Sequence, residues 1–286
     1  MDIVLGPNRY GKAEVRLVRV TRSEQHEITD LNVSVALAGD LAGSHLSGDN
    51  AHVLPTDTQK NTVYAFAREY GVDQIEDFGL RLARHFVESQ PAIERARVTI
   101  EEYAWRPLGP HSFQRSGPET RTATVYCDSA RTQVVSGVTG LVLLNSTGSE
   151  FHGFARDRYT TLEETTDRIL ATSVTACWRH GGVDSWWRES YVSARDHLIA
   201  AFTETHSLAL QQTLYAMGQR VLEHRPEVVE VRLSLPNKHH FLVDLAPFEL
   251  DNPGEVFFAA DRPYGLIEGT VQRAGAPPSM EEAWSG

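Results

Sequence analysis

The feature that most constrains the fold of this chain is a short internal repeat. Residues 88–93 read Glu-Ser-Gln-Pro-Ala-Ile, and residues 223–228 read Glu-His-Arg-Pro-Glu-Val. At the same offset, residues 97–100 (Arg-Val-Thr-Ile) match residues 232–235 (Arg-Leu-Ser-Leu). In both copies the proline ends a helix-type pattern and precedes a strand-type pattern. A helix, a proline and a strand that recur in this way predict a duplicated unit.

Hydrophobic periodicity predicts a similar order of elements in the two halves of the chain. The predicted elements of the first half are strands at 15–20 and 31–37, helices at 60–70 and 72–89, and a strand at 95–105. Those of the second half are a strand at 134–144, a short helical turn at 160–170, helices at 190–205 and 207–224, and a strand at 228–235.

These patterns predict an α+β fold made of two tandem units, at residues 1–133 and 134–272. Each unit is expected to have an antiparallel sheet with helices on one face. The tail at residues 273–286 begins with a Pro/Gly-rich stretch, and we expect it to be disordered.

Composition and charge argue against several functions and locations. The formal net charge of -11 at pH 7 argues against nucleic-acid binding, which requires cationic side chains. No run of 18 apolar residues is present, so no membrane span is predicted. The first residues lack the basic region of a signal peptide, and the last residues are not a Ser-Lys-Leu peroxisomal signal. Together these observations predict a cytoplasmic location.

Cysteine and histidine spacing predicts neither a metal nor a cofactor. Cys127 follows a strand-type pattern and Cys177 lies in a helix-type run, so both are interpreted as reduced packing residues. The chain has no His-Glu-x-x-His motif and no His/Cys cluster at ligand spacing. No Gly-x-Gly-x-x-Gly follows a strand, so no dinucleotide site is predicted.

Residues 230–244 place two polar groups at the predicted end of a strand. Apolar residues alternate up to Pro236, which cannot donate to a sheet ladder. Asn237 and His239 are two positions apart, so in extended chain their side chains share one side. An amide and a titratable imidazole would then lie together, although a capped loop with a hydrogen-bonded histidine also fits this segment.

Four motifs in order make this chain similar to urate oxidase (uricase). They are Arg9-Tyr10-Gly11-Lys12, residues 56–62 (Thr-Asp-Thr-Gln-Lys-Asn-Thr), the segment from Phe151 to Arg168, and residues 234–239 (Ser-Leu-Pro-Asn-Lys-His). The resemblance extends from about Arg9 to about Val271. It implies the tunnelling fold, in which such units close into a barrel between subunits. It also implies a homotetramer with active sites at subunit interfaces.

The resemblance implies oxidation of urate by O2 and water to 5-hydroxyisourate and hydrogen peroxide, without a cofactor. Arg168 would bind the flat urate anion through its planar fork of donors, joined by Gln211 and by Leu210 before it. Phe151 would stack on the purine face. The alternatives are a surface ion pair of Arg168 with Glu164 and a core position for Phe151.

Lys12, Thr56 and His239 match the proton-relay positions of that family. A lysine acts as a base only when desolvation or a neighbouring cation lowers its pKa, and a threonine hydroxyl can pass a proton onward. Asp57 would contact the substrate through its backbone N–H, and Asn237 would hold O2 or water above the ring. Without the resemblance, Lys12 would be a surface lysine and Thr56 a helix-capping residue.

Two other functions remain open from the sequence. The first is a tunnelling-fold enzyme that acts on pterins, but such enzymes use zinc ligands or a nucleophilic cysteine. The second is a purine-binding protein without turnover, which would not need the relay residues.

Overall fold

The structure, a computed structural model, describes residues 2–284. The chain divides into two compact units. Unit 1 comprises Met1–Gly137, Cys177–Tyr191 and Gly275–Gly286, and unit 2 comprises Val138–Ala176 and Val192–Ala274. The chain first leaves unit 1 after Gly137, a few positions beyond the limit at residue 133 that the sequence predicts.

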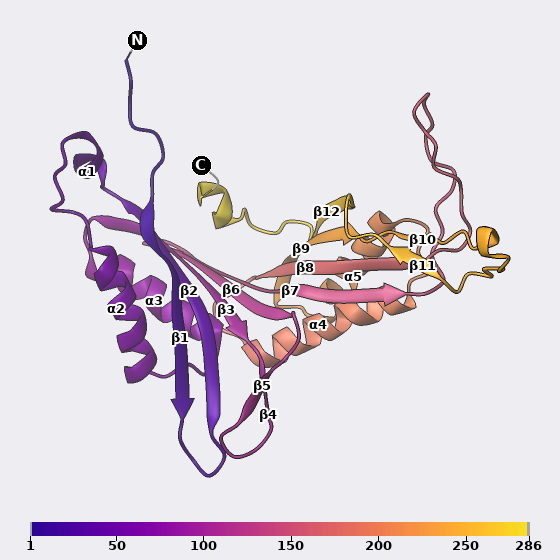
Figure 1. Cartoon of the computed structure of the whole chain (residues 1–286). Coiled ribbons are helices and arrows are strands. Elements are labelled where there is room, and N and C mark those ends of the chain that lie inside the picture. The colour runs from indigo at the N-terminus through magenta and orange to yellow at the C-terminus, as the bar shows by residue number, and fades with distance from the viewer. Residues whose placement is uncertain (1, 285–286) are drawn as a thin grey trace. The chain divides into compact units, whose positions relative to one another are not determined.

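Unit 1 contains an antiparallel sheet with two helices packed against it. Strands β1 (Tyr10–Thr21), β2 (Glu27–Gly39), β3 (Ile93–Tyr103) and β6 (Thr120–Asp128) are neighbours in that order, and each pair is antiparallel. Helix α2 (Thr56–Glu69) packs on β1, and α3 (Ile75–Ser89) packs on β3 and β6 (Figure 1). The alternating residues of β2 supply the core, since Leu31, Val33 and Leu37 are completely buried.

Unit 2 repeats this plan. Strands β7 (Thr132–Asn145) and β8 (Leu170–His180) lie mostly in unit 2, and β9 (Val228–Asn237) and β12 (Gly265–Gln272) lie entirely in it; these strands are neighbours in that order. The helices are α4 (Trp187–Glu204) and α5 (Leu210–His224), and α5 packs on β9 and β12. The order strand, strand, helix, helix, strand, strand therefore occurs twice. This confirms the predicted α+β fold with a duplicated unit.

Shorter elements lie outside these long strands. They are α1 (Ala42–Leu46), the strand pair β4 (Trp105–Pro107) and β5 (Phe113–Arg115), the pair β10 (His240–Leu242) and β11 (Phe257–Ala259), and two 3-10 helices, η1 (Ala246–Phe248) and η2 (Met280–Trp284). None of the helices in residues 2–284 is long and apolar enough to cross a membrane.

The helical turn predicted at residues 160–170 is wrong. Residues 160–169 contain no helix, and β8 begins at Leu170. A side-chain-capped turn replaces it: Asp157 accepts from the backbone N–H of Tyr159 (2.9 Å), and the Thr160 hydroxyl contacts the backbone N–H of Asp157 (2.8 Å). Beyond this turn, Thr165 pairs with Phe151 in an antiparallel bridge. These bonds use backbone groups that a helix would need.

Two further expectations differ from the structure. Cys177 lies in strand β8 rather than in a helix, whereas Cys127 lies in strand β6 as expected. The tail predicted to be disordered includes the 3-10 helix η2, in which Trp284 is only 5% exposed. Trp284 packs near Tyr126, and its carbonyl accepts from Arg9 (2.7 Å). Apolar burial of one large aromatic side chain holds this segment; residues 285 and 286 lie outside the described residues.

Candidate active site

The candidate site residues fall into two groups, one in each unit. The relay group, in unit 1, is Lys12, Thr56 and Asp57. The clamp group, in unit 2, is Phe151, Arg168, Leu210, Gln211, Asn237 and His239.

Lys12 lies at a β-bulge in β1. The register between β1 and β2 shifts between Lys12 and Val15, and Glu14 has a φ of 56° within the bulge. The Glu14 backbone N–H donates to the Ser34 hydroxyl (3.0 Å). A Cβ at Gly11 would lie 1.9 Å from the Val35 carbonyl oxygen, so only glycine fits before Lys12. Bulges re-aim side chains, and this one sets the direction of Lys12.

Thr56 and Asp57 form the first turn of α2. Pro55 occupies the N-cap position and no side chain caps the helix, so the capping role considered for Thr56 is not found. The Asp57 carboxylate accepts from Lys60 and from Asn61 (3.0 Å). The bond from Lys60 lowers the pKa of Asp57, and the charge of Lys12 contributes to the same shift. N–H groups in a first helical turn lack intrahelical acceptors, so the Asp57 N–H can donate to an anion.

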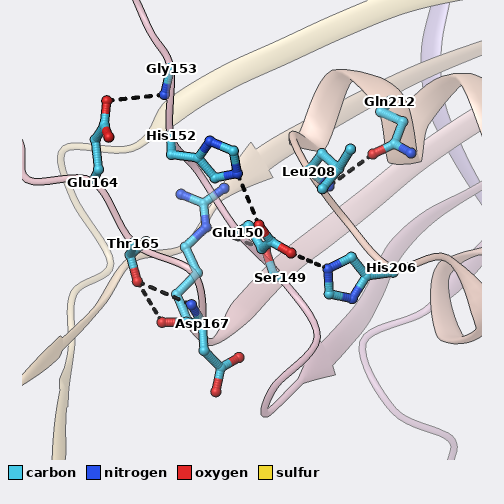
Figure 2. A network of polar contacts seen from close by, with 11 residues as sticks. Ser149, Glu150, His152, Gly153, Glu164, Thr165, Asp167, His206, Leu208 and Gln212 are labelled. Atoms are coloured by element: carbon cyan, nitrogen blue, oxygen red, sulfur yellow. Dashed lines mark hydrogen bonds and ion pairs between the residues drawn. The ribbon is translucent and has the colours of Figure 1, made fainter.

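Phe151 and Arg168 lie together in unit 2. The Arg168 guanidinium carbon is 5.1 Å from the centre of the Phe151 ring. Arg168 Nε donates to the Ser149 hydroxyl (3.3 Å), and burial lowers the pKa of Arg168. The alternative ion pair with Glu164 is not formed among the described residues, because Glu164 accepts from the Gly153 N–H instead (3.0 Å, Figure 2). The guanidinium fork is therefore not neutralised by that carboxylate.

His239 belongs to the same part of unit 2. Asn237 ends β9, and the next backbone N–H, from Lys238, donates to the Ala171 carbonyl of β8 (2.8 Å). The His239 ring stacks on Phe241 at 5.8 Å between centroids. Burial lowers the pKa of His239, and the charges of Arg168 and His240 lower it further. At neutral pH the imidazole is thus uncharged and able to accept a proton.

Leu210 and Gln211 begin helix α5. The Leu210 side chain is buried in the core (2% exposed), whereas the Gln211 side chain is exposed. Leu210 can therefore reach a ligand only through its backbone. Gln211 is free to present its amide.

Sequence patterns did not identify the residues that support the clamp group. Ser149 is completely buried and accepts from Arg168, and the Glu150 carboxylate accepts from His152 (3.0 Å) and from His206. Only their position next to Phe151 could have drawn attention to Ser149 and Glu150. No sequence signal links residue 206 to them.

Known uricases match nearly the whole length of this chain. The family model described as Uricase matches residues 8–126 and 134–268. The uricase of Arthrobacter globiformis is 56% identical over 277 residues, which cover 96% of this chain and 91% of that protein. The uricase of Dictyostelium discoideum is 37% identical, with 93% and 96% covered.

Solved structures agree with the sequence matches. The crystal structure of the Arthrobacter globiformis uricase superimposes with a TM-score of 0.96 at 55% identity, covering 100% of both chains. The urate oxidase of Bacillus sp. TB-90 superimposes with a TM-score of 0.79 at 26% identity, covering 93% of this chain and 100% of that one. On the extent of the family match and these identities, the chain belongs to the uricase family.

Proposed function

We propose that the clamp group binds urate and that Lys12, Thr56 and His239 remove a proton from it, in the oxidation of urate to 5-hydroxyisourate and hydrogen peroxide. The observation that carries this proposal is the placement of the Arg168 guanidinium over the Phe151 ring, close enough for its charge to lower the pKa of His239. A cation, an aromatic face and a neutral base are what a flat, acidic purine anion requires.

Binding would use the geometry of the clamp group. A purine lying on Phe151 would be within reach of the Arg168 fork, which can bind a carbonyl oxygen and a ring nitrogen together. Gln211 would add a second planar pair of hydrogen bonds, next to the backbone N–H of Leu210. Asn237 would hold O2, or the water that replaces it, above the ring.

Proton transfer would use Lys12, Thr56 and His239. The urate monoanion gives one proton to this relay and becomes a dianion, which is a good one-electron donor. The dianion then passes two electrons, one at a time, to O2. Water adds to the oxidised purine to give 5-hydroxyisourate. The reduced oxygen takes up two protons, one from the relay and one from solvent, and leaves as hydrogen peroxide.

No step in this scheme uses a metal or a cofactor, because urate itself supplies the electrons. A pterin-directed enzyme of the same fold would need zinc ligands or a nucleophilic cysteine. Cys127 is buried, and burial raises the pKa of its thiol, which disfavours the reactive thiolate. A cytoplasmic location remains a prediction from the sequence.

We further propose a homotetramer in which each site combines the relay group of one chain with the clamp group of its neighbour. The two groups belong to different units, and sheets with open edges are stabilised when another chain closes them. A two-fold interface would then carry two equivalent sites.

The reaction is tested by following urate absorbance in air together with hydrogen peroxide. We expect both loss of urate and stoichiometric peroxide. Binding of urate without turnover would support a purine-binding protein. Turnover of a pterin but not of urate would support a pterin-directed enzyme.

The shared site is tested by mixing two inactive variants, Thr56→Ala and Arg168→Ala. In a mixed pair of chains, one site collects both substitutions and the other collects neither. Random mixing makes about half of the pairs mixed, so about a quarter of all sites should be intact. Co-expression should restore activity on that order. If mixed oligomers confirmed by mass are no more active than either variant alone, each site lies within one chain.

A further inference from the structure

The segment Gly148–Phe151 connects the main parts of the clamp group. On one side, the Glu150 N–H donates to the Ser207 carbonyl (2.7 Å) and the Ser207 N–H donates to the Gly148 carbonyl (3.0 Å). On the other side, Phe151 exchanges two backbone bonds with Thr165 (2.8 and 3.0 Å). The segment is therefore held between the loop that precedes β8 and the link that precedes α5.

This segment carries one clamp residue and supports another. Phe151 is its last residue, and the Ser149 hydroxyl accepts from Arg168 Nε (3.3 Å). A shift of the segment along its own axis would move the aromatic ring and the guanidinium together. Its position consequently determines how well urate fits.

Glu150 fastens the segment through its side chain. One carboxylate oxygen accepts from His206 Nε2 and the other from His152 Nε2 (3.0 Å), as Figure 2 shows. The carboxylate is 20% exposed, while His206 and His152 are 58% and 50% exposed. Glu150 therefore connects the segment to the link between α4 and α5 by a bond that is independent of the backbone.

The link that receives this bond also leads to Gln211. His206 follows the end of α4 at Glu204, and α5 begins at Leu210. Within the link, the Leu208 N–H donates to Gln212 Oε1 (2.8 Å), and the Thr213 hydroxyl donates to the buried Ser207 hydroxyl (2.8 Å). The Glu150–His206 contact thus joins the support of Phe151 and Arg168 to the support of Gln211.

We propose that Glu150 is a positioning residue for urate binding, which it serves by fixing the Gly148–Phe151 segment to His206. This inference rests on the proposed role of the clamp group. Glu150, His152 and His206 do not form a metal site. Residues 2–284 contain no group of three or more His, Cys, Asp or Glu side chains that could hold a metal ion. Their role is to hold the clamp residues in register, since bound geometry is sensitive to small displacements.

Hydrogen bonding supports this role at neutral pH. The bonds from His206 and then His152 lower the pKa of Glu150, so the carboxylate stays ionised well below pH 7. Hydrogen bonds to an ionised acceptor are stronger than neutral ones.

The test is urate binding by Glu150 variants of the full chain. Urate is titrated without O2 by calorimetry, and kcat, KM and melting temperature are measured in air-saturated buffer. We expect Glu150→Ala to raise both the Kd and the KM for urate about tenfold, with kcat within about threefold of wild type. Glu150→Gln keeps an acceptor and should recover most of the affinity. His206→Ala changes an exposed position and should also raise the Kd for urate. It replaces Glu150→Ala in the test if that variant does not fold.

The matched control is Glu204→Ala. Glu204 lies two positions before His206 and pairs with Arg220 of α5. Within residues 2–284, its carboxylate makes no hydrogen bond or ion pair with the Gly148–Phe151 segment. Its loss should leave Kd unchanged. Wild-type affinity in Glu150→Ala and His206→Ala, or equal weakening in Glu204→Ala, would overturn the inference. Arg168→Ala is the reference for the clamp itself: if it binds urate as wild type does, the clamp assignment fails and this inference fails with it.

Discussion

A buried ion pair in unit 1 provides a sharp test of how this fold is stabilised. Arg121 donates to Glu76 (2.7 Å), to Gln74 (3.0 Å) and to Glu102 (3.2 Å). Glu76 is completely buried and also accepts from the Ser136 hydroxyl (2.7 Å). Replacing Arg121 by methionine keeps most of the buried volume but leaves the Glu76 carboxylate without its cation.

The expected loss of stability is large. Removing one partner of a buried pair costs about 3–5 kcal/mol, because the remaining charge is uncompensated. The matched exposed pair is Arg262 with Asp261, whose side chains are 83% and 77% exposed. Arg262→Met should therefore change the free energy of unfolding by about 0–1 kcal/mol. The double variant Glu76→Leu/Arg121→Met, which removes both charges, should recover most of the loss.

The pH dependence of the loss has a definite sign. Burial raises the pKa of Glu76 even with Arg121 present, and removing the arginine raises it further. When the pKa of a carboxyl is higher in the folded protein than its unfolded value of about 4.3, the protein loses stability as the pH rises through the folded pKa. Arg121→Met should thus be less destabilised at pH 5 than at pH 8.

The assay is urea unfolding followed by tryptophan fluorescence, at one protein concentration because oligomerisation contributes to stability. The ring of Trp187, in T-shaped contact with His180 at 4.9 Å, reports on this region, since His180 contacts Ser136 (3.0 Å). A change below about 1 kcal/mol, or a greater loss at pH 5 than at pH 8, would refute the reasoning.

Three further predictions concern the reaction. Thr56→Ala and Lys12→Met should each slow turnover by about a hundredfold or more while urate affinity changes little, and near-normal turnover in both would remove the relay from the mechanism. Active protein should contain no stoichiometric transition metal by elemental analysis and should keep its activity in excess chelator; loss of activity on removal of a bound metal would contradict this. The pKa of His239, followed by NMR, should lie below the ordinary value of about 6.5 and should rise in Arg168→Ala, since burial and the Arg168 charge both lower it. An unchanged or lower value in the variant would exclude that influence of Arg168.

Local patterns in the sequence predicted most of the fold because its elements are strongly periodic. Alternation at residues 31–37 and helical spacing at 72–89 both correspond to buried faces in β2 and α3. The prediction failed at residues 160–169, where the backbone bonds of Thr165 go to Phe151. That partner is distant in sequence, so local propensity contains no information about it.

The tail shows the same limitation. Its Pro/Gly-rich start predicts disorder, but Trp284 finds a site on the sheet of unit 1, where the Arg97 guanidinium lies 5.3 Å from its ring. The Met280 N–H donates to the Gln133 side chain (2.9 Å). Both contacts join residues that are far apart in the sequence, and composition alone cannot reveal them.

The relay group illustrates why candidate site residues are easier to identify from the sequence than the residues that position them. Lys12 stands in a motif, so the resemblance identifies it directly. Its direction, however, depends on Gly11, which allows the close approach of Val35, and on Glu14, which adopts a left-handed conformation with Ser34 as acceptor. A non-glycine residue at positive φ is unfavourable, so Glu14 adopts it only because the surrounding β-bulge enforces it. Chemistry therefore selects the motif residues by type, whereas backbone geometry selects the residues that aim them.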